Sequence, residues 1–146
     1  MPKSNSEGFT IIELMIVVLV LGVIAALALP SFKSILDGRK LKGAADELYA
    51  MLQFARSESI KQNQAIYFDI DVANWCFGVD DAGADCDCTN PSSCTISGQN
   101  KVVDDSDAAP VLISSATVNN ITFNTPNAIP DSSGTFTLAL PDGRTK

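Results

Sequence analysis

The sequence contains no histidine in its 146 residues. Histidine is the commonest general base in enzymes and a frequent zinc ligand, so the usual catalytic and zinc-binding groupings lack a member. No glycine-rich, phosphate-binding loop follows a strand-like run either. We therefore expect a protein that is not an enzyme and that holds no metal ion and no cofactor.

Positive charge is scarce in the second part of the chain. Residues 63–146 contain three Lys or Arg and eleven Asp or Glu, a net charge of −8, whereas residues 1–62 contain seven and six, a net charge of +1. An acidic domain repels phosphate backbones over most of its surface, which disfavours broad binding of nucleic acid. The acids are typical of a soluble, solvent-exposed domain.

The N-terminal part, in contrast, is almost wholly apolar from Phe9 to Leu29. About 20 such residues suffice to span the hydrocarbon core of a bilayer, whereas the apolar region of a secretory signal peptide has about 7–15. We therefore expect residues 9–29 to form a single transmembrane helix that the protein keeps. Lys3, before this segment, favours a cytoplasmic start.

One carboxylate, Glu13, interrupts the apolar segment. An ionised acid in the hydrocarbon costs about 2.5–3.5 kcal/mol on insertion scales, which indicates a function and a partner. If the chain is cut between Gly8 and Phe9, the new α-amino group of Phe9 lies one helical turn from Glu13. That amine, on the same or a neighbouring subunit, can neutralise the acid. A plain anchor, with Glu13 near the interface, is the alternative.

The run from Gly8 to Glu13, Gly-Phe-Thr-Ile-Ile-Glu, resembles the class III signal of type IV prepilins and type II secretion pseudopilins. The resemblance implies that residues 1–8 are a leader, that prepilin peptidase cleaves between Gly8 and Phe9, and that Phe9 is then N-methylated. It also implies an inner-membrane protein with a periplasmic head that later enters a pilus or pseudopilus. One departure is the leader, whose only basic side chain is Lys3 and which carries Glu7 before the glycine, whereas prepilin leaders tend to be more basic.

A helical pattern continues beyond the membrane segment. Pro30 is expected to kink or thin the helix, and Gly38 and Gly43 to weaken it. Apolar residues then recur at helical spacing, which predicts an amphipathic second half over residues 30–62; they are Ile35, Leu41, Ala45, Leu48, Leu52 and Ala55.

From residue 63 onward the apolar period is two, which predicts strands separated by Asp, Gly, Ser, Asn and Pro turns. Longer strands are expected at residues 65–70, 74–79, 117–123 and 135–140, and shorter ones at residues 101–103 and 111–113. The predicted fold class is α+β and pilin-like: a long N-terminal helix, transmembrane in its first half, packs its second half against an antiparallel sheet formed by residues 63–146.

Four cysteines, Cys76, Cys86, Cys88 and Cys94, lie on one strand and the long loop after it. Their spacing lacks the pairs of cysteines, separated by about two to four residues, that bind zinc. An oxidising compartment beyond the membrane also favours two disulfides over a metal. The pairing stays open, although a bond between Cys86 and Cys88 is disfavoured by their separation. Alternating acids in the same loop, from Asp80 to Asp87, suggest a calcium loop but lack the terminal glutamate of an EF-hand.

A second resemblance narrows the family. The stretch from Leu52 to Asn63, with Ala-Arg-Ser-Glu-Ser-Ile-Lys at its centre, is similar to the helix end of the GspH/FimT family of minor pilins and minor pseudopilins, and residues 121–123 and 134–138 resemble its later strands. The resemblance implies a minor pilin that joins a type IV pilus through its N-terminal helix, in initiation or at the tip. Its partners would be other major and minor pilins or pseudopilins, prepilin peptidase and the inner membrane.

Two other functions stay open under this resemblance. One is a minor pseudopilin of a type II secretion system. The other is a pilus-borne receptor for DNA uptake, with Arg144 and Lys146 on phosphates. Members commonly end in a Gly-Arg-x-Arg-like tail, whereas this chain has Gly143, Arg144, Thr145 and Lys146.

Overall fold

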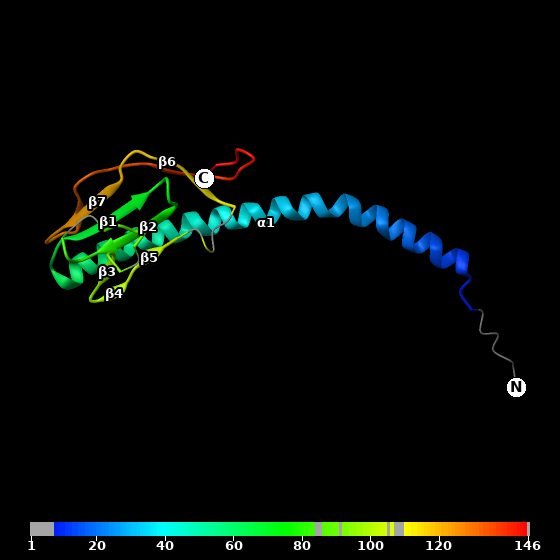
Figure 1. The fold of residues 1–146 in the computed structure, drawn as a ribbon, viewed down its shortest axis with the longest axis horizontal. Coiled ribbons are helices and arrows are strands. Elements are labelled where there is room, and N and C mark those ends of the chain that lie inside the picture. Colours follow the sequence, from blue (N-terminus) through cyan, green and yellow to red (C-terminus); the bar gives the residue numbers. More distant parts are fainter. Residues whose placement is uncertain (1–7, 84–85, 91, 105, 107–109, 146) are drawn as a thin grey trace, which may run out of the picture. The chain divides into compact units, whose positions relative to one another are not determined.

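The structure is a computed structural model that describes residues 8–83, 86–90, 92–104, 106 and 110–145, with the backbone alone at residues 28–31 (Figure 1). The chain divides into two compact units, residues 1–36 and 37–146. All buried hydrophobic residues of the described chain lie between Leu41 and Leu140. The second unit, called the head below, therefore carries its complete core.

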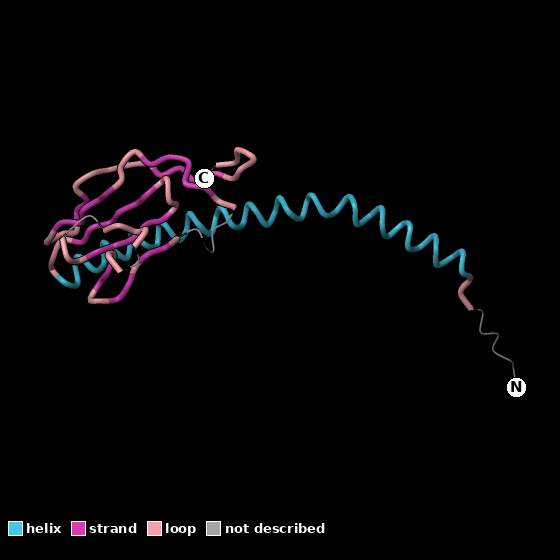
Figure 2. The backbone as a smooth tube through the Cα atoms, in the orientation of Figure 1, coloured by secondary structure: helices cyan, strands magenta, loops and turns pink. Residues whose placement is uncertain are grey.

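The chain begins with one long helix, α1, Ile11–Gln62. Figure 2 draws it as one uninterrupted coil, so the helix predicted to continue past the membrane segment is confirmed, and it runs through Pro30. The helix stops where Asn63 adopts a left-handed conformation with φ 49°, a common way to end a helix for which asparagine is suited. Lys61 lies in the last turn, where a cation interacts favourably with the helix dipole.

The head contains a five-stranded antiparallel sheet with the order β5-β2-β1-β7-β8. Its strands are β1 Ile66–Asp71, β2 Cys76–Asp80, β5 Val102–Val103, β7 Asn120–Asn124 and β8 Ile129–Pro130. Two smaller antiparallel pairs complete the head: β3 Thr95–Ile96 with β4 Gln99–Asn100, and β6 Leu112–Ala116 with β9 Phe136–Ala139. The α+β, pilin-like fold class is confirmed.

The core joins the second half of α1 to the sheet. Leu41, Leu48 and Ala55 are buried on one face of the helix, and β1 alternates buried and half-buried residues as its period of two predicts. Phe68, on the buried face of β1, is fully covered and meets Phe136 of β9 edge to face at 5.9 Å between ring centroids. The core cluster comprises Leu41, Ala44, Leu48, Ala55, Ile66, Phe68, Ile70, Trp75, Phe77, Val79, Ile96, Val111, Ile113, Ile121, Phe123, Ala128, Leu138 and Leu140.

Several strand boundaries differ from the prediction. The strand expected from residue 74 begins at Cys76, because Asn74 belongs to a turn held by Asp71 and Trp75 has a left-handed φ of 49°. The strand expected over residues 117–123 begins at Asn120, after a bend, and the one expected over residues 111–113 is longer, Leu112–Ala116. Strands β3, β4 and β8, of two residues each, were not predicted.

Candidate processing and assembly site

The segment in front of α1 is exposed and lies outside regular secondary structure. Residues 8–10 precede the helix, and an added side chain at Gly8 would meet nothing within 4 Å. Phe9 is 78% exposed. The described side chains therefore leave the Gly8–Phe9 peptide bond uncovered and accessible to a peptidase. The rest of the predicted leader, residues 1–7, lies outside the described residues.

Thr10 caps the helix. Its hydroxyl Oγ1 accepts a hydrogen bond from the backbone N–H of Glu13 at 3.3 Å, and its carbonyl accepts one from the N–H of Leu14 at 3.2 Å. Thr-x-x-Glu is the spacing of a capping box, in which the acid also lies in the first turn, where the helix dipole is positive. The sequence prediction missed this role of Thr10, although the spacing was readable.

The same position gives Glu13 its electrostatic setting. The positive end of the helix dipole favours a carboxylate in the first turn. A free amine on Phe9 would add a second positive charge near this helix end. The carboxylate of Glu13 would therefore be close to two positive charges, the end of the helix dipole and the amine of Phe9. Its side chain is exposed.

The first part of α1 has no partner for its apolar surface within the described chain. The large apolar side chains described between Ile11 and Leu36 are 43–80% exposed. By length and composition α1 is able to cross a membrane, and none of its most apolar window is buried. Such a surface needs lipid or the helices of other subunits around it.

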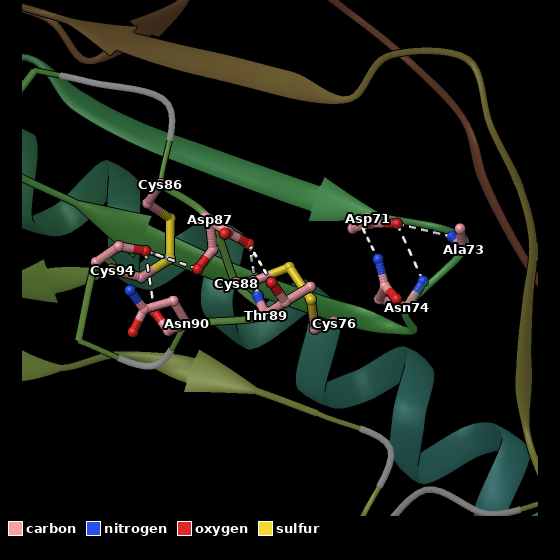
Figure 3. Close-up of a disulfide and its surroundings, with 11 residues drawn as sticks. Asp71, Ala73, Asn74, Cys76, Cys86, Asp87, Cys88, Thr89, Asn90 and Cys94 are labelled. Carbon is pink, nitrogen blue, oxygen red and sulfur yellow. Dashed lines mark hydrogen bonds between the residues drawn. A yellow bond between two sulfur atoms is a disulfide. The ribbon is translucent and has the colours of Figure 1, made fainter.

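The four cysteines form two disulfides, as predicted (Figure 3). Cys76 of β2 pairs with Cys88, and Cys86 pairs with Cys94, with Cα–Cα distances of 5.6 and 4.9 Å. All four side chains are buried together. The two overlapping bridges fasten the loop after β2 to the sheet.

The acids of this loop act as turn acceptors. Asp80 accepts hydrogen bonds from the N–H groups of Ala82 and Thr95, at 2.8 and 3.2 Å, and Asp81 accepts one from Ser97 at 2.7 Å. No group of three or more possible metal ligands occurs among the described residues. Asp80 and Asp81 thus take part in local hydrogen bonds, while Asp85 of the suggested calcium loop lies outside the described residues.

The C-terminal cation proposed for DNA contact is held by carboxylates. Arg144 Nε donates to Asp142 Oδ2 at 2.8 Å, and its Nη2 lies 4.0 Å from Asp37 Oδ2 on α1. The two acids offset the charge of the guanidinium and hold it in place. Lys146, the second predicted contact, lies outside the described residues.

Comparison with known protein families gives one match for the head and one for the N-terminal segment. Residues 44–146 match the family model described as Type II transport protein GspH. The chain belongs to the GspH family. Residues 3–29 match the model described as the prokaryotic N-terminal methylation motif. Searches of curated proteins and of solved structures returned no significant match.

Membership of the GspH family confirms the prediction that the chain is a pilin or pseudopilin. Its members are structural, non-enzymatic proteins of the pilin and pseudopilin class. A GspH protein with the methylation motif is a substrate of prepilin peptidase and assembles with other pilins. The apolar helix with this motif fits a pilin anchored in the inner membrane.

Proposed function

We propose that this GspH protein is a minor pilin that joins a type IV pilus through its N-terminal helix, in initiation or at the tip. Residues 1–8 are its leader, residues 9–29 its transmembrane and assembly helix, residues 30–62 the amphipathic second half, and residues 63–146 a periplasmic head. The observation that carries the proposal is the exposed Gly8–Phe9 bond directly before a helix whose first half leaves its apolar side chains uncovered.

The chemistry of entry follows from the same segment. Cleavage after Gly8 leaves an amine on Phe9, which is then methylated and stays positively charged. The helix of a subunit still in the membrane carries Glu13 at a depth where an unpaired charge is costly. Pairing Glu13 with the amine of a neighbour removes two uncompensated charges, which favours addition of the subunit to a growing filament.

Processing is tested by replacing the glycine at the cut. Gly8→Val should accumulate in the membrane as uncut precursor in cells that contain prepilin peptidase, while the parent yields a mature protein whose mass begins at methylated Phe9. Gly22→Val is the matched control, because an added side chain at Gly22 also meets nothing within 4 Å. A parent N-terminus near Ala28, or normal processing of Gly8→Val, would refute the proposal.

A pseudopilin of a type II secretion system is the second candidate, and the description of the matched family favours it. Both roles use the same processing and the same helix. Crosslinking in the native host separates them: contacts with pilus subunits support the pilin, and contacts with secretion-system subunits support the pseudopilin. The DNA-receptor alternative gains nothing from the ion pairs of Arg144.

A further inference from the structure

A cavity of about 450 Å³ lies in the head between the turn that joins β1 to β2 and the start of β6. Its lining consists of residues 72–75, residues 110–113 and Pro141. The lining is mostly aliphatic, aromatic and proline, and none of the described residues that form it is charged. A cavity of this size and composition is typical of a site that accepts apolar groups.

An open strand edge runs beside this cavity. In the described part of the chain β6 pairs with β9 alone, so its other edge carries backbone groups without a strand partner. Leu112, on β6, lines the cavity and is 51% exposed. The edge strands of the five-stranded sheet are poorer templates: β5 has two residues, and β8 has two and includes Pro130. The outer edge of β9 is partly occupied, because Ala139 forms a bridge with Thr145. An extended peptide could add to β6 and place alternate side chains in the cavity.

Trp75 forms part of the cavity wall and is unusual in two respects. Its φ of 49° is rare for a bulky residue, and its indole Nε1, although buried, has no hydrogen-bond acceptor in the described chain. An unpaired buried donor is unfavourable. The nitrogen is covered in this structure, and the residue that carries it lines the cavity. Strain and an unpaired donor at one position are typical of sites that bind.

Acidic residues near the cavity favour an occupant that carries cationic residues on either side of its apolar part. Asp71 precedes the lining residue Val72; Asp142 follows Pro141, but its carboxylate is already paired with Arg144. The carboxylate of Asp71 accepts hydrogen bonds from Ala73 and Asn74, which Figure 3 draws at the end of β1. These bonds, chiefly from Asn74, lower the pKa of Asp71 and keep it ionised. The head also carries many more acids than bases, so an acidic occupant would be repelled.

We propose that this cavity and the open edge of β6 bind an extended peptide segment of another protein, with branched apolar side chains flanked by Lys or Arg. The peptide backbone pairs with β6, and an apolar side chain fills the cavity beside Trp75. The cationic flanks face an acidic surface. This interaction does not depend on which filament the helix joins.

The experiment uses the head, residues 37–146, labelled with ¹⁵N. The probe is a capped pentapeptide with the order lysine, valine, threonine, valine, lysine; its control has glutamate in place of both lysines. Trp75 is the only tryptophan of the protein, so its indole N–H gives one signal. Titration with the basic probe should shift this signal and the amide signals of Leu112 and Ile113 to saturation, and the acidic peptide should bind on the order of tenfold more weakly.

Variants locate the site. Leu112→Asp and Ala73→Glu, on opposite walls of the cavity, should each weaken binding of the basic probe on the order of tenfold. Ile129→Asp is the matched control, because Ile129 is a strand residue that is 61% exposed and does not line the cavity. Circular dichroism and the absence of free thiols establish that each variant is folded.

Three results would overturn the proposal. They are the lack of a saturable indole shift with the basic probe, equal affinity for the acidic peptide, and a loss in Ile129→Asp as large as that in Leu112→Asp. Since the head lacks the processing segment, none of these results bears on cleavage after Gly8.

Discussion

Gly78 lies in the middle of β2, opposite Asp69 of β1 and Val102 of β5. A Cβ atom there would lie 2.8 Å from Sγ and 2.9 Å from Cβ of Cys94, and 3.0 Å from the carbonyl oxygen of Lys101. These neighbours belong to a disulfide and to the backbone, so they have little freedom to move. Gly78→Ala should therefore cost about 1–3 kcal/mol as an overpacked site, against a gain of about 0.4–1 kcal/mol from the less flexible unfolded chain.

The free energy of unfolding of Gly78→Ala should thus fall by about 1–2 kcal/mol if the Cys86–Cys94 bridge still forms. If the displaced Cys94 no longer pairs, the loss grows by about 2.5 kcal/mol, the chain-entropy value for a bridge with a sequence separation of 8. Thiol titration of the denatured, non-reduced protein distinguishes the two cases. Either way, the required space, and not a special backbone angle, explains the glycine at this position.

The assay is guanidinium unfolding of the oxidised head, in which a loss of this size should lower the midpoint by roughly 0.3–0.7 M. Gly43→Ala is the control, because an added side chain at Gly43 meets nothing within 4 Å. In the helix that change should stabilise the head by up to about 1 kcal/mol, so the two glycines should shift the midpoint in opposite directions. A midpoint for Gly78→Ala equal to or above that of the parent would refute the packing argument.

Four further outcomes are expected. Glu13→Ala should be processed and retained in the membrane but scarce in purified filaments by immunoblot; normal incorporation would make the acid dispensable. The oxidised head should contain no free thiol when denatured without reductant, whereas four thiols in protein from its native compartment would contradict both bridges. Hydrogen bonds lower the pKa values of Glu58, Asp71 and Asp131 from their ordinary 4.5, 3.8 and 3.8, so the unfolded chain binds protons first as the pH falls. The free energy of unfolding should thus be retained above about pH 5 and fall below about pH 4, and a head equally stable at pH 3 and pH 6 would contradict this sign. Because acids hold Arg144, the head should not retard duplex DNA in a gel at low salt; retardation that Arg144→Ala abolishes would support the DNA receptor instead.

The helix was predictable because its two halves carry strong and different patterns. Unbroken apolar character marks the first half, and helical spacing marks the second. Leu41, Leu48 and Ala55, which the spacing placed on the apolar face, are 6%, 5% and 0% exposed. Ile35 belongs to the same pattern but is 53% exposed, since the core of the head begins only at Leu41. The period identifies a face, but only the tertiary structure says how far along the helix that face is covered.

The strands divide in the same way. The six residues of β1 alternate clearly and were found within one residue, whereas β3, β4 and β8 are too short to carry a period and exist because their neighbours pair with them. Trp75 has a high strand propensity and was assigned to a strand, yet the turn held by Asp71 places it outside. The pairing of the cysteines likewise follows from the path of the loop, which spacing alone does not give.

The stretch that resembles the helix end of the GspH family has a structural explanation. Ala55, Glu58 and Ser59 are 0%, 8% and 0% exposed, so they share the covered face of α1. Glu58 accepts hydrogen bonds from Lys61 and Gln62, and Ser59 Oγ lies 2.9 Å from the carbonyl oxygens of Gln64 and Phe123. The buried serine thereby joins the end of the helix to β7. This part of the family pattern stabilises the attachment of the helix to the sheet, so it identifies the fold without specifying a partner. Pilins and pseudopilins share the processing segment, so the residues that distinguish one member's role from another's lie elsewhere on the exposed surface, and the open edge of β6 is the described part of that surface that we propose for it.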